Sequence, residues 1–282
     1  IYKTNIVQAE ANYATTTAIV KGRRGDFNGA LDKFKEALSY DVPGKYEYRQ
    51  RVAEYFIGGD GPSLKDPGVV DGYLFALEET DKNIEENSID YLPYLYASRL
   101  CIFLGQDNSK SPYNDRALDY ANKSLQISPT FVRSYYEVAQ AYLNKKEYSK
   151  ALETFQKAID LNPEVGLSYW YLGVAKLENK DVSGLVDMDK GVSMGYLPAE
   201  QDYLRLVDLY LGQKDFKHIA GIYEKLIYLS PDNPQYYASL ATAYAQIGRL
   251  DDAETVTRKA VEIDPSFAHD AEVFLHSIGR KL

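Results

Sequence analysis

A period of 34 residues in the second half of the chain constrains its fold more than any other feature. Prolines carry the period most visibly, and its missing beat falls at Leu197, one residue before Pro198. The proline set is Pro129, Pro163, Pro231 and Pro265. Early in each repeat the sets are Tyr135, Tyr169, Tyr203 and Tyr237; Val138, Leu172, Leu206 and Leu240; and Ala139, Gly173, Val207 and Ala241. Later sets are Ala151, Leu185, Ile219 and Ala253, and Ala158, Val192, Leu226 and Ala260. Such a period predicts stacked helix–turn–helix repeats, since only a neighbouring repeat covers the apolar face of each one.

The spacing within one repeat predicts two amphipathic helices. Tyr135, Val138, Ala139 and Tyr142 follow the i, i+3, i+4, i+7 pattern of one helix face. Ala151, Phe155 and Ala158 do the same for a second helix. Small residues let the paired helices approach closely, and proline ends each repeat because it cannot continue a helix interior. Both faces are therefore expected to pack within the stack.

This order of aromatic, leucine, small residue, aromatic, alanine, aromatic, alanine and proline resembles the tetratricopeptide repeat family over about 130–267. The resemblance implies an all-α, right-handed α-solenoid of about seven helix pairs with a C-terminal capping helix, forming one continuous array. We expect a lead-in at 1–10, divergent repeats over 11–131 with loop inserts at 58–68 and 105–115, four regular repeats over 132–267, and a capping helix at 268–282. In the repeat at 166–199, Asp189 takes the place of an aromatic, which predicts looser packing.

Composition and motifs argue against several functions. The chain has 41 acidic and 32 basic residues, a balance that disfavours nucleic-acid binding. No window reaches the roughly 18–20 uncharged apolar residues of a membrane span. His269 and His276 are seven residues apart and lack the spacing of a metal site, and Cys101 reads as a buried structural thiol. The acidic stretches at 78–90 and 105–115 read as a solvated helix face and a solvated loop. We therefore predict no catalysis by the chain itself, no cofactor and no metal.

The tetratricopeptide resemblance implies a concave groove lined by positions 2, 5, 9 and 12 of each repeat. These positions hold Arg133, Tyr136, Gln140 and Leu143; Leu167, Trp170, Val174 and Leu177; and Gln201, Leu204, Asp208 and Leu211. The family's carboxylate-binding pattern has lysine and asparagine at positions 5 and 9, which this chain lacks. The groove is therefore predicted to bind a mostly apolar peptide or partner helix. Trp170 and Tyr136 have two interpretations, as groove residues or as core residues packed against a neighbouring helix.

A second resemblance covers mainly residues 1–56. The opening IYKTNIVQAEANYA and the repeat after it are similar to the tails that follow the last membrane span of some bacterial O-antigen ligase/polymerase-like proteins. This resemblance implies an alternative function, that of an extracytoplasmic accessory tail of a membrane glycan-assembly protein, with a glycan as a further ligand. The start at Ile1 rather than methionine fits a fragment of such a protein. The N-terminus lacks the apolar core of a signal peptide, so the chain as given is expected to be soluble.

Overall fold

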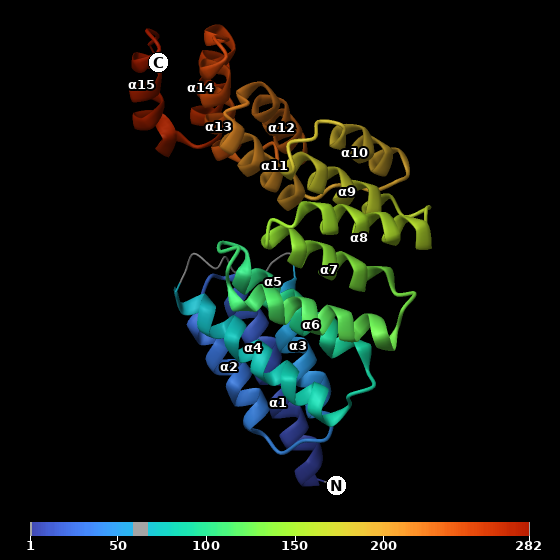
Figure 1. Ribbon diagram of the computed structural model, residues 1–282. Coiled ribbons are helices and arrows are strands. Elements are labelled where there is room, and N and C mark those ends of the chain that lie inside the picture. The colour runs from blue at the N-terminus through green and yellow to red at the C-terminus, as the bar shows by residue number, and fades with distance from the viewer. Residues whose placement is uncertain (1, 59–66, 282) are drawn as a thin grey trace. The chain divides into compact units, whose positions relative to one another are not determined.

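The computed structural model describes residues 2–58 and 67–281, and all regular structure in these ranges is helical (Figure 1). The helices follow one another as seven pairs and a terminal helix, which confirms the predicted repeat fold and its cap. The first helices are α1 (Tyr2–Arg23), α3 (Lys45–Ile57), α5 (Tyr91–Gly105), α7 (Val132–Asn144), α9 (Gly166–Glu178), α11 (Glu200–Gln213) and α13 (Pro234–Gln246). The second helices are α2 (Phe27–Ser39), α4 (Pro67–Glu86), α6 (Pro112–Ile127), α8 (Tyr148–Leu161), α10 (Gly184–Ser193), α12 (Phe216–Leu229) and α14 (Leu250–Ile263). A 3-10 turn, η1 (Pro265–Phe267), leads into α15 (Ala268–Ser277).

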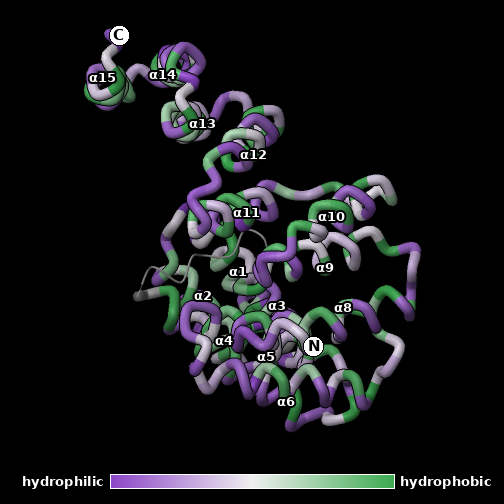
Figure 2. The backbone as a smooth tube through the Cα atoms, turned by 45° about the horizontal axis from the view of Figure 1, so that its top comes forward, coloured by the Kyte–Doolittle hydropathy of each residue, from purple (hydrophilic) through white to green (hydrophobic). Residues whose placement is uncertain are grey.

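Contacts between helices divide the chain into two compact parts rather than one continuous array. The N-terminal part, residues 1–195, contains α1–α10, and the C-terminal part, residues 196–282, contains α11–α15. The division follows Gly195 and coincides with the one place where the proline period fails, at Leu197. Coloured by hydropathy, the helices alternate between hydrophobic and hydrophilic stretches (Figure 2), as expected when each buries one face.

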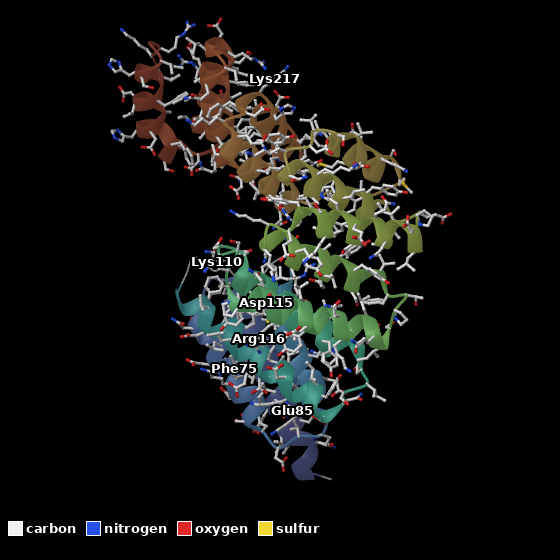
Figure 3. The ribbon with its side chains drawn as sticks, viewed as in Figure 1. Phe75, Glu85, Lys110, Asp115, Arg116 and Lys217 are labelled. Atoms are coloured by element: carbon white, nitrogen blue, oxygen red, sulfur yellow. The ribbon has the colours of Figure 1, made fainter. Side chains whose placement is uncertain are left out.

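The segments expected to be irregular are shorter than predicted where the structure describes them. The predicted lead-in at 1–10 is instead part of α1 from Tyr2 onward. Most of the predicted insert at 58–68 lies outside the described residues. The insert at 105–115 shrinks to 106–111, because Ser111 caps α6 and Pro112 occupies its first turn. Asp115 lies in α6 near Lys110 of the turn (Figure 3) and forms an ion pair with Lys145.

The α7–α8 pair packs as its spacing predicts. Ala151, Phe155 and Ala158 of α8 are buried, and the Phe155 ring lies 6.4 Å from that of Tyr136 on α7. The Phe155 ring also lies 5.9 Å from that of Tyr171 on α9. One aromatic side chain, flanked by two alanines, therefore joins three helices.

The α9–α10 pair departs from the predicted register by one residue. Its second helix buries Gly184, Met188 and Gly191 instead of the predicted positions Leu185, Asp189 and Val192. These three residues keep the i, i+4, i+7 spacing of the buried face of α8. The slip leaves neighbouring apolar side chains outside, and Val186 is 71% exposed.

The prediction of looser packing in this repeat is wrong for α9 against α10. A Cβ atom on Gly184 would lie 2.3 Å from the Gly173 carbonyl oxygen, and one on Gly191 would lie 2.6 Å from the Gly166 oxygen. No real side chain fits at such distances. The missing side chains let the two backbones come into direct contact.

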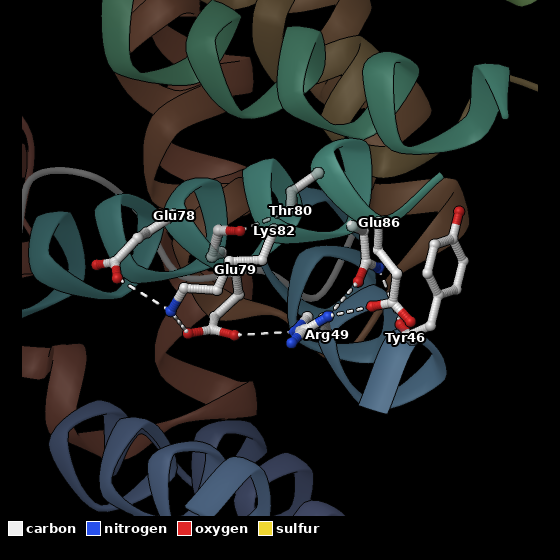
Figure 4. Close-up of polar contacts among 9 residues, drawn as sticks. Tyr46, Arg49, Glu78, Glu79, Thr80, Lys82 and Glu86 are labelled. Atoms are coloured by element: carbon white, nitrogen blue, oxygen red, sulfur yellow. Dashed lines mark hydrogen bonds and ion pairs between the residues drawn. The ribbon is translucent and has the colours of Figure 1, made fainter. Parts of the chain in front are cut away.

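The acidic stretch at 78–90 is partly buried, which corrects its interpretation as a solvated face. Arg49 of α3 reaches Glu79 of α4 (Nε to Oε2, 3.4 Å) and Glu86 (Nη1 to Oε2, 2.7 Å) (Figure 4). Lys82 completes the network by pairing with Glu79 at 2.6 Å. Asn83 accepts a hydrogen bond from Arg49 and donates one to the Tyr46 carbonyl oxygen. The stretch carries charge because it faces a cation on the paired helix.

The turns inside the regular pairs share one backbone feature. Lys146, Lys180, Lys214 and Gly248, spaced by 34 residues, all have positive φ, at 61°, 63°, 57° and 79°. Left-handed backbone costs a side-chain-bearing residue roughly 1–2 kcal/mol, and only the last of the four turns uses glycine. The repeat therefore fixes the turn geometry even where the residue type does not favour it.

Candidate functional site

The N-terminal part has a cavity of about 380 Å3 lined only by first helices. α3, α5, α7 and α9 contribute in turn, so the cavity runs across four successive helix pairs. Its apolar lining comes from Ile57, Leu95 and Leu167, with tyrosine rings beside them. Its charged lining is two arginines and two glutamates: Arg99, Arg133, Glu54 and Glu137. The lining thus offers both hydrophobic contact and hydrogen bonds.

A buried ion pair connects α5 and α7 beside the cavity. The Arg99 Nη2 atom lies 3.1 Å from Glu137 Oε1, and the side chains are 30% and 5% exposed. The second carboxylate oxygen of Glu137, Oε2, is buried without a hydrogen-bond partner in the part of the chain that the structure describes. A buried acceptor without a donor is unfavourable and uncommon in folded proteins.

The two members of this pair shift each other's protonation. Burial raises the pKa of the Glu137 carboxyl, and the charges of Arg99 and Arg133 oppose that rise. Burial acts to lower the pKa of Arg99, but the Glu137 carboxylate and the Tyr171 hydroxyl outweigh it and raise that pKa above its ordinary value. The Arg99 guanidinium is therefore charged at neutral pH.

Three tyrosines complete the lining and hold the helices together. The Tyr136 and Ser168 hydroxyls of α7 and α9 are hydrogen-bonded at 2.6 Å, and the Tyr136 and Tyr171 rings meet edge-on at 5.1 Å. Tyr96 donates from its hydroxyl to Glu54 Oε1 at 2.9 Å, joining α5 to α3. Burial and this carboxylate raise the pKa of Tyr96, so it stays a hydrogen-bond donor. The cavity is therefore held by contacts that cross from each first helix to the next.

Only some of the predicted groove residues meet at this cavity. Arg133, Tyr136 and Leu167 line it, whereas Gln140, Leu143, Trp170, Val174 and Leu177 are absent from its lining. Trp170 is 3% exposed, and Leu143, Val174 and Leu177 are similarly buried. This burial favours the core interpretation for Trp170, while Tyr136 is both buried and part of the lining. Gln140 is half-buried and donates to Asn144.

The predicted residues of α11 belong to the C-terminal part. Gln201, Asp208 and Leu211 are exposed there and Leu204 is half-buried. A role for them in binding stays a prediction.

Sequence reasoning missed two groups of lining residues. Tyr96, Glu137 and Tyr171 occupy the sixth position of their repeats, next to the predicted fifth. Leu95 and Arg99 correspond to Tyr136 and Gln140 but precede them by 41 residues, because the α5–α6 turn adds seven residues to the period. Continuing the register through that insert would have found them. Glu137 carries its own signal, as the one carboxylate in the otherwise uncharged run from Ser134 to Leu143.

Other candidate chemistry is accounted for in the described ranges. Cys101 is fully buried, and burial raises the pKa of its thiol to about 12. No group of three or more His, Cys, Asp or Glu side chains that could hold a metal ion occurs within residues 2–58 and 67–281. Over the same residues, no helix combines the length and apolar character needed to cross a membrane.

The helix pairs, their 34-residue period and a cavity formed by first helices define a helical-repeat protein. Residues 132–165 and 222–255 each match a tetratricopeptide repeat model. The chain therefore belongs to the tetratricopeptide repeat family, whose members are generally non-catalytic scaffolds for other proteins or peptides.

Similar proteins agree with this assignment. The chain is 23% identical over 160 residues to a BBSome complex member BBS4 homolog from Drosophila melanogaster, which covers 52% of this chain and 33% of that protein. It is 25% identical over 166 residues to TPR repeat-containing protein MJ1428 from Methanocaldococcus jannaschii, covering 52% of this chain and 29% of that protein. The match thus spans about a third of each relative's length. The structure of a human IFIT1 dimer with PPP-AAAA has a similar fold, with a TM-score of 0.51, 15% identity, and coverage of 90% of this chain and 54% of that one.

Proposed function

We propose that the chain is a non-catalytic scaffold that binds a segment of a partner protein in the cavity of the N-terminal part. One observation carries the proposal: four successive first helices, α3, α5, α7 and α9, line a single cavity of about 380 Å3. Volumes of this order are typical of pockets that enclose a small ligand or a few side chains. The apolar lining from Ile57, Leu95 and Leu167 supports the expectation of a mostly apolar segment.

The charged lining extends that expectation. An entirely apolar segment would desolvate Arg99 and Glu137 without replacing their bonds to water, at a cost in affinity. A segment with apolar residues around a polar one fits the lining better.

A peptide selection tests the proposal. A phage-displayed library of random peptides is selected on the whole chain, and enriched peptides are measured by calorimetry against the wild type and Leu167→Asp. Leu167→Asp places an unpaired carboxylate in the apolar lining and should weaken binding at least tenfold. Lys123→Asp, on the exposed surface of α6, is the matched control and should bind as the wild type does. Peptides that bind all three chains equally would show that the cavity is not the binding site.

The second resemblance gives an alternative proposal, in which the chain is an accessory part of a membrane glycan-assembly protein and the cavity takes a carbohydrate. Tyrosine rings beside arginine and glutamate side chains suit sugar hydroxyls as well as peptides. A glycan array probed with the wild type and Leu167→Asp separates the two. Glycan binding that Leu167→Asp abolishes supports the alternative, whereas peptide binding alone supports the scaffold.

A further inference from the structure

The cavity lining has no net charge, and this narrows the ligand. This inference rests on the proposed function and adds the chemistry of the partner segment. Arg99 and Arg133 are balanced by Glu54 and Glu137. A ligand group with a full charge therefore meets both an attractive and a repulsive partner within the same small volume.

Glu137 asks for a hydrogen-bond donor. Its side chain is 5% exposed, Oε1 faces Arg99, and Oε2 is buried without a partner. A group that enters the cavity and donates to Oε2 removes an unfavourable state that exists before binding. A group that cannot donate leaves it in place.

Arg99 offers donors beside that acceptor. A guanidinium carries five N–H groups, and the Arg99 side chain, 30% exposed, contacts Glu137 at 3.1 Å through Nη2. The best complement is a neutral group that carries an acceptor and a donor side by side. Among protein side chains only the primary amide of asparagine or glutamine does so.

The other side-chain classes fit less well. A carboxylate would bond Arg99 but face Glu137 and Glu54, and it would leave Oε2 without a donor. An ammonium or guanidinium would bond Oε2 but face Arg99 and Arg133. An apolar side chain would satisfy neither residue.

We infer that the cavity recognises the side-chain amide of an asparagine or glutamine in the partner segment, its N–H donating to Glu137 Oε2 and its oxygen accepting from Arg99. Apolar residues on either side of this amide contact Ile57, Leu95 and Leu167. The amide supplies specificity, because a site built to form hydrogen bonds rejects ligands that leave its groups unpaired.

The peptide selection also tests this inference. Cavity-dependent peptides, meaning those that Leu167→Asp releases, should share one asparagine or glutamine position. Replacing glutamine there by glutamate, lysine or methionine, in synthetic peptides, should weaken binding to the wild type at least tenfold in each case. Cavity-dependent peptides without a shared amide, or ones that prefer a charged residue there, would overturn the inference and leave the proposed function intact. Failure to obtain any cavity-dependent peptide would instead count against the proposed function.

Glu137→Gln provides the decisive variant. It removes one negative charge with little change of shape and gives residue 137 an N–H that can donate to a ligand carboxylate. The preference for a glutamine over a glutamate peptide should then fall from tenfold to about equal or reverse. Arg133→Gln is the matched control, because it changes the lining charge by the same amount but leaves the Arg99–Glu137 pair intact, so the amide preference should persist. An unchanged preference in Glu137→Gln, with melting like that of the wild type, would refute the role of Glu137. If Glu137→Gln does not fold, Arg99→Lys, which removes the planar donor group, should lower the amide preference in its place.

Discussion

Two helix pairs of the N-terminal part achieve close packing by opposite means. α3 and α4 are joined by charge: Arg49 meets Glu79, whose side chain is 9% exposed, and Glu86. α9 and α10 are joined by the absence of side chains, with Gly173 and Gly184 each facing the other's carbonyl oxygen. The first interface depends on every partner being present, and the second on nothing being added.

The difference shows what the 34-residue repeat actually fixes. It fixes where helices begin, turn and meet, but leaves open how the interface between them is filled. α8 fills it with Phe155, α10 with Met188 between two glycines, and α4 with an ion network. Each solution has its own sensitivity to mutation, which gives ways to test the comparison.

The largest effect is expected for Gly184→Ala. The added Cβ would lie 2.3 Å from the Gly173 oxygen, so α9 and α10 must move apart and lose contact along their length. We expect a loss of about 3 kcal/mol in the free energy of unfolding, measured by urea denaturation, because backbone cannot yield as a side chain does.

Gly221→Ala is the matched control for this loss. It lies inside α12, where a Cβ meets nothing within 4 Å. Helix propensity alone should therefore raise stability by about 0.5–1 kcal/mol. Equal effects at both glycines would mean that the α9–α10 backbones are not in contact.

Arg49→Met tests the charged interface. It deprives the buried Glu79 of one of its two cations, while Lys82 still pairs with it at 2.6 Å. We expect a loss of about 2 kcal/mol in the free energy of unfolding, less than for an isolated buried pair. Lys82→Met removes the more exposed cation and should cost below about 1 kcal/mol. Should Lys82→Met prove the costlier change, burial would not be what gives Arg49 its weight.

The pH dependence of stability tests the second buried charge, Glu137. Because its folded-state pKa is raised above the ordinary value of 4.5, the folded chain holds this proton more tightly than the unfolded chain. The resulting stabilisation is complete below the unfolded-state pKa and is lost as the pH rises through the folded-state pKa. Relative to Glu137→Gln, the wild type should therefore lose stability between about pH 4 and pH 8, followed by urea denaturation at each pH. A relative gain over this range would mean that Arg99 dominates over burial.

These interfaces mark how far the sequence predicts the structure. The period predicts the first helices from α7 onward, because their apolar positions recur without insertion. It does not predict the slip in α10, since losing one residue in the turn after Lys180 moves the buried face from Asp189 to Met188 while the period of the flanking helices is kept. Apolar residues left at the old register, such as Val192, make the wrong alignment look satisfactory.

The candidate site was only partly predictable for a related reason. Family positions identify Arg133, Tyr136 and Leu167, which the cavity brings together. They also place Trp170 in a groove, although it is buried, because periodicity gives the angle of a residue around a helix and not the depth of its neighbours. The pairing of Arg99 with Glu137 joins residues 38 positions apart across an insert, and no local pattern encodes it.

The smallest effect concerns the turn that leads into α10. Lys180 has a φ of 63°, a conformation that glycine adopts without steric cost, as Gly248 does at the matching position two repeats later. Lys180→Gly should raise the free energy of unfolding by about 0.5–1 kcal/mol, since the relief of left-handed strain exceeds the added entropy of the unfolded chain. Lys180→Ala removes the same charge but keeps a Cβ atom, so it should give no such gain in the same urea titration. A gain from both variants would trace the effect to the lysine charge, and the turn would then impose no strain on the repeat.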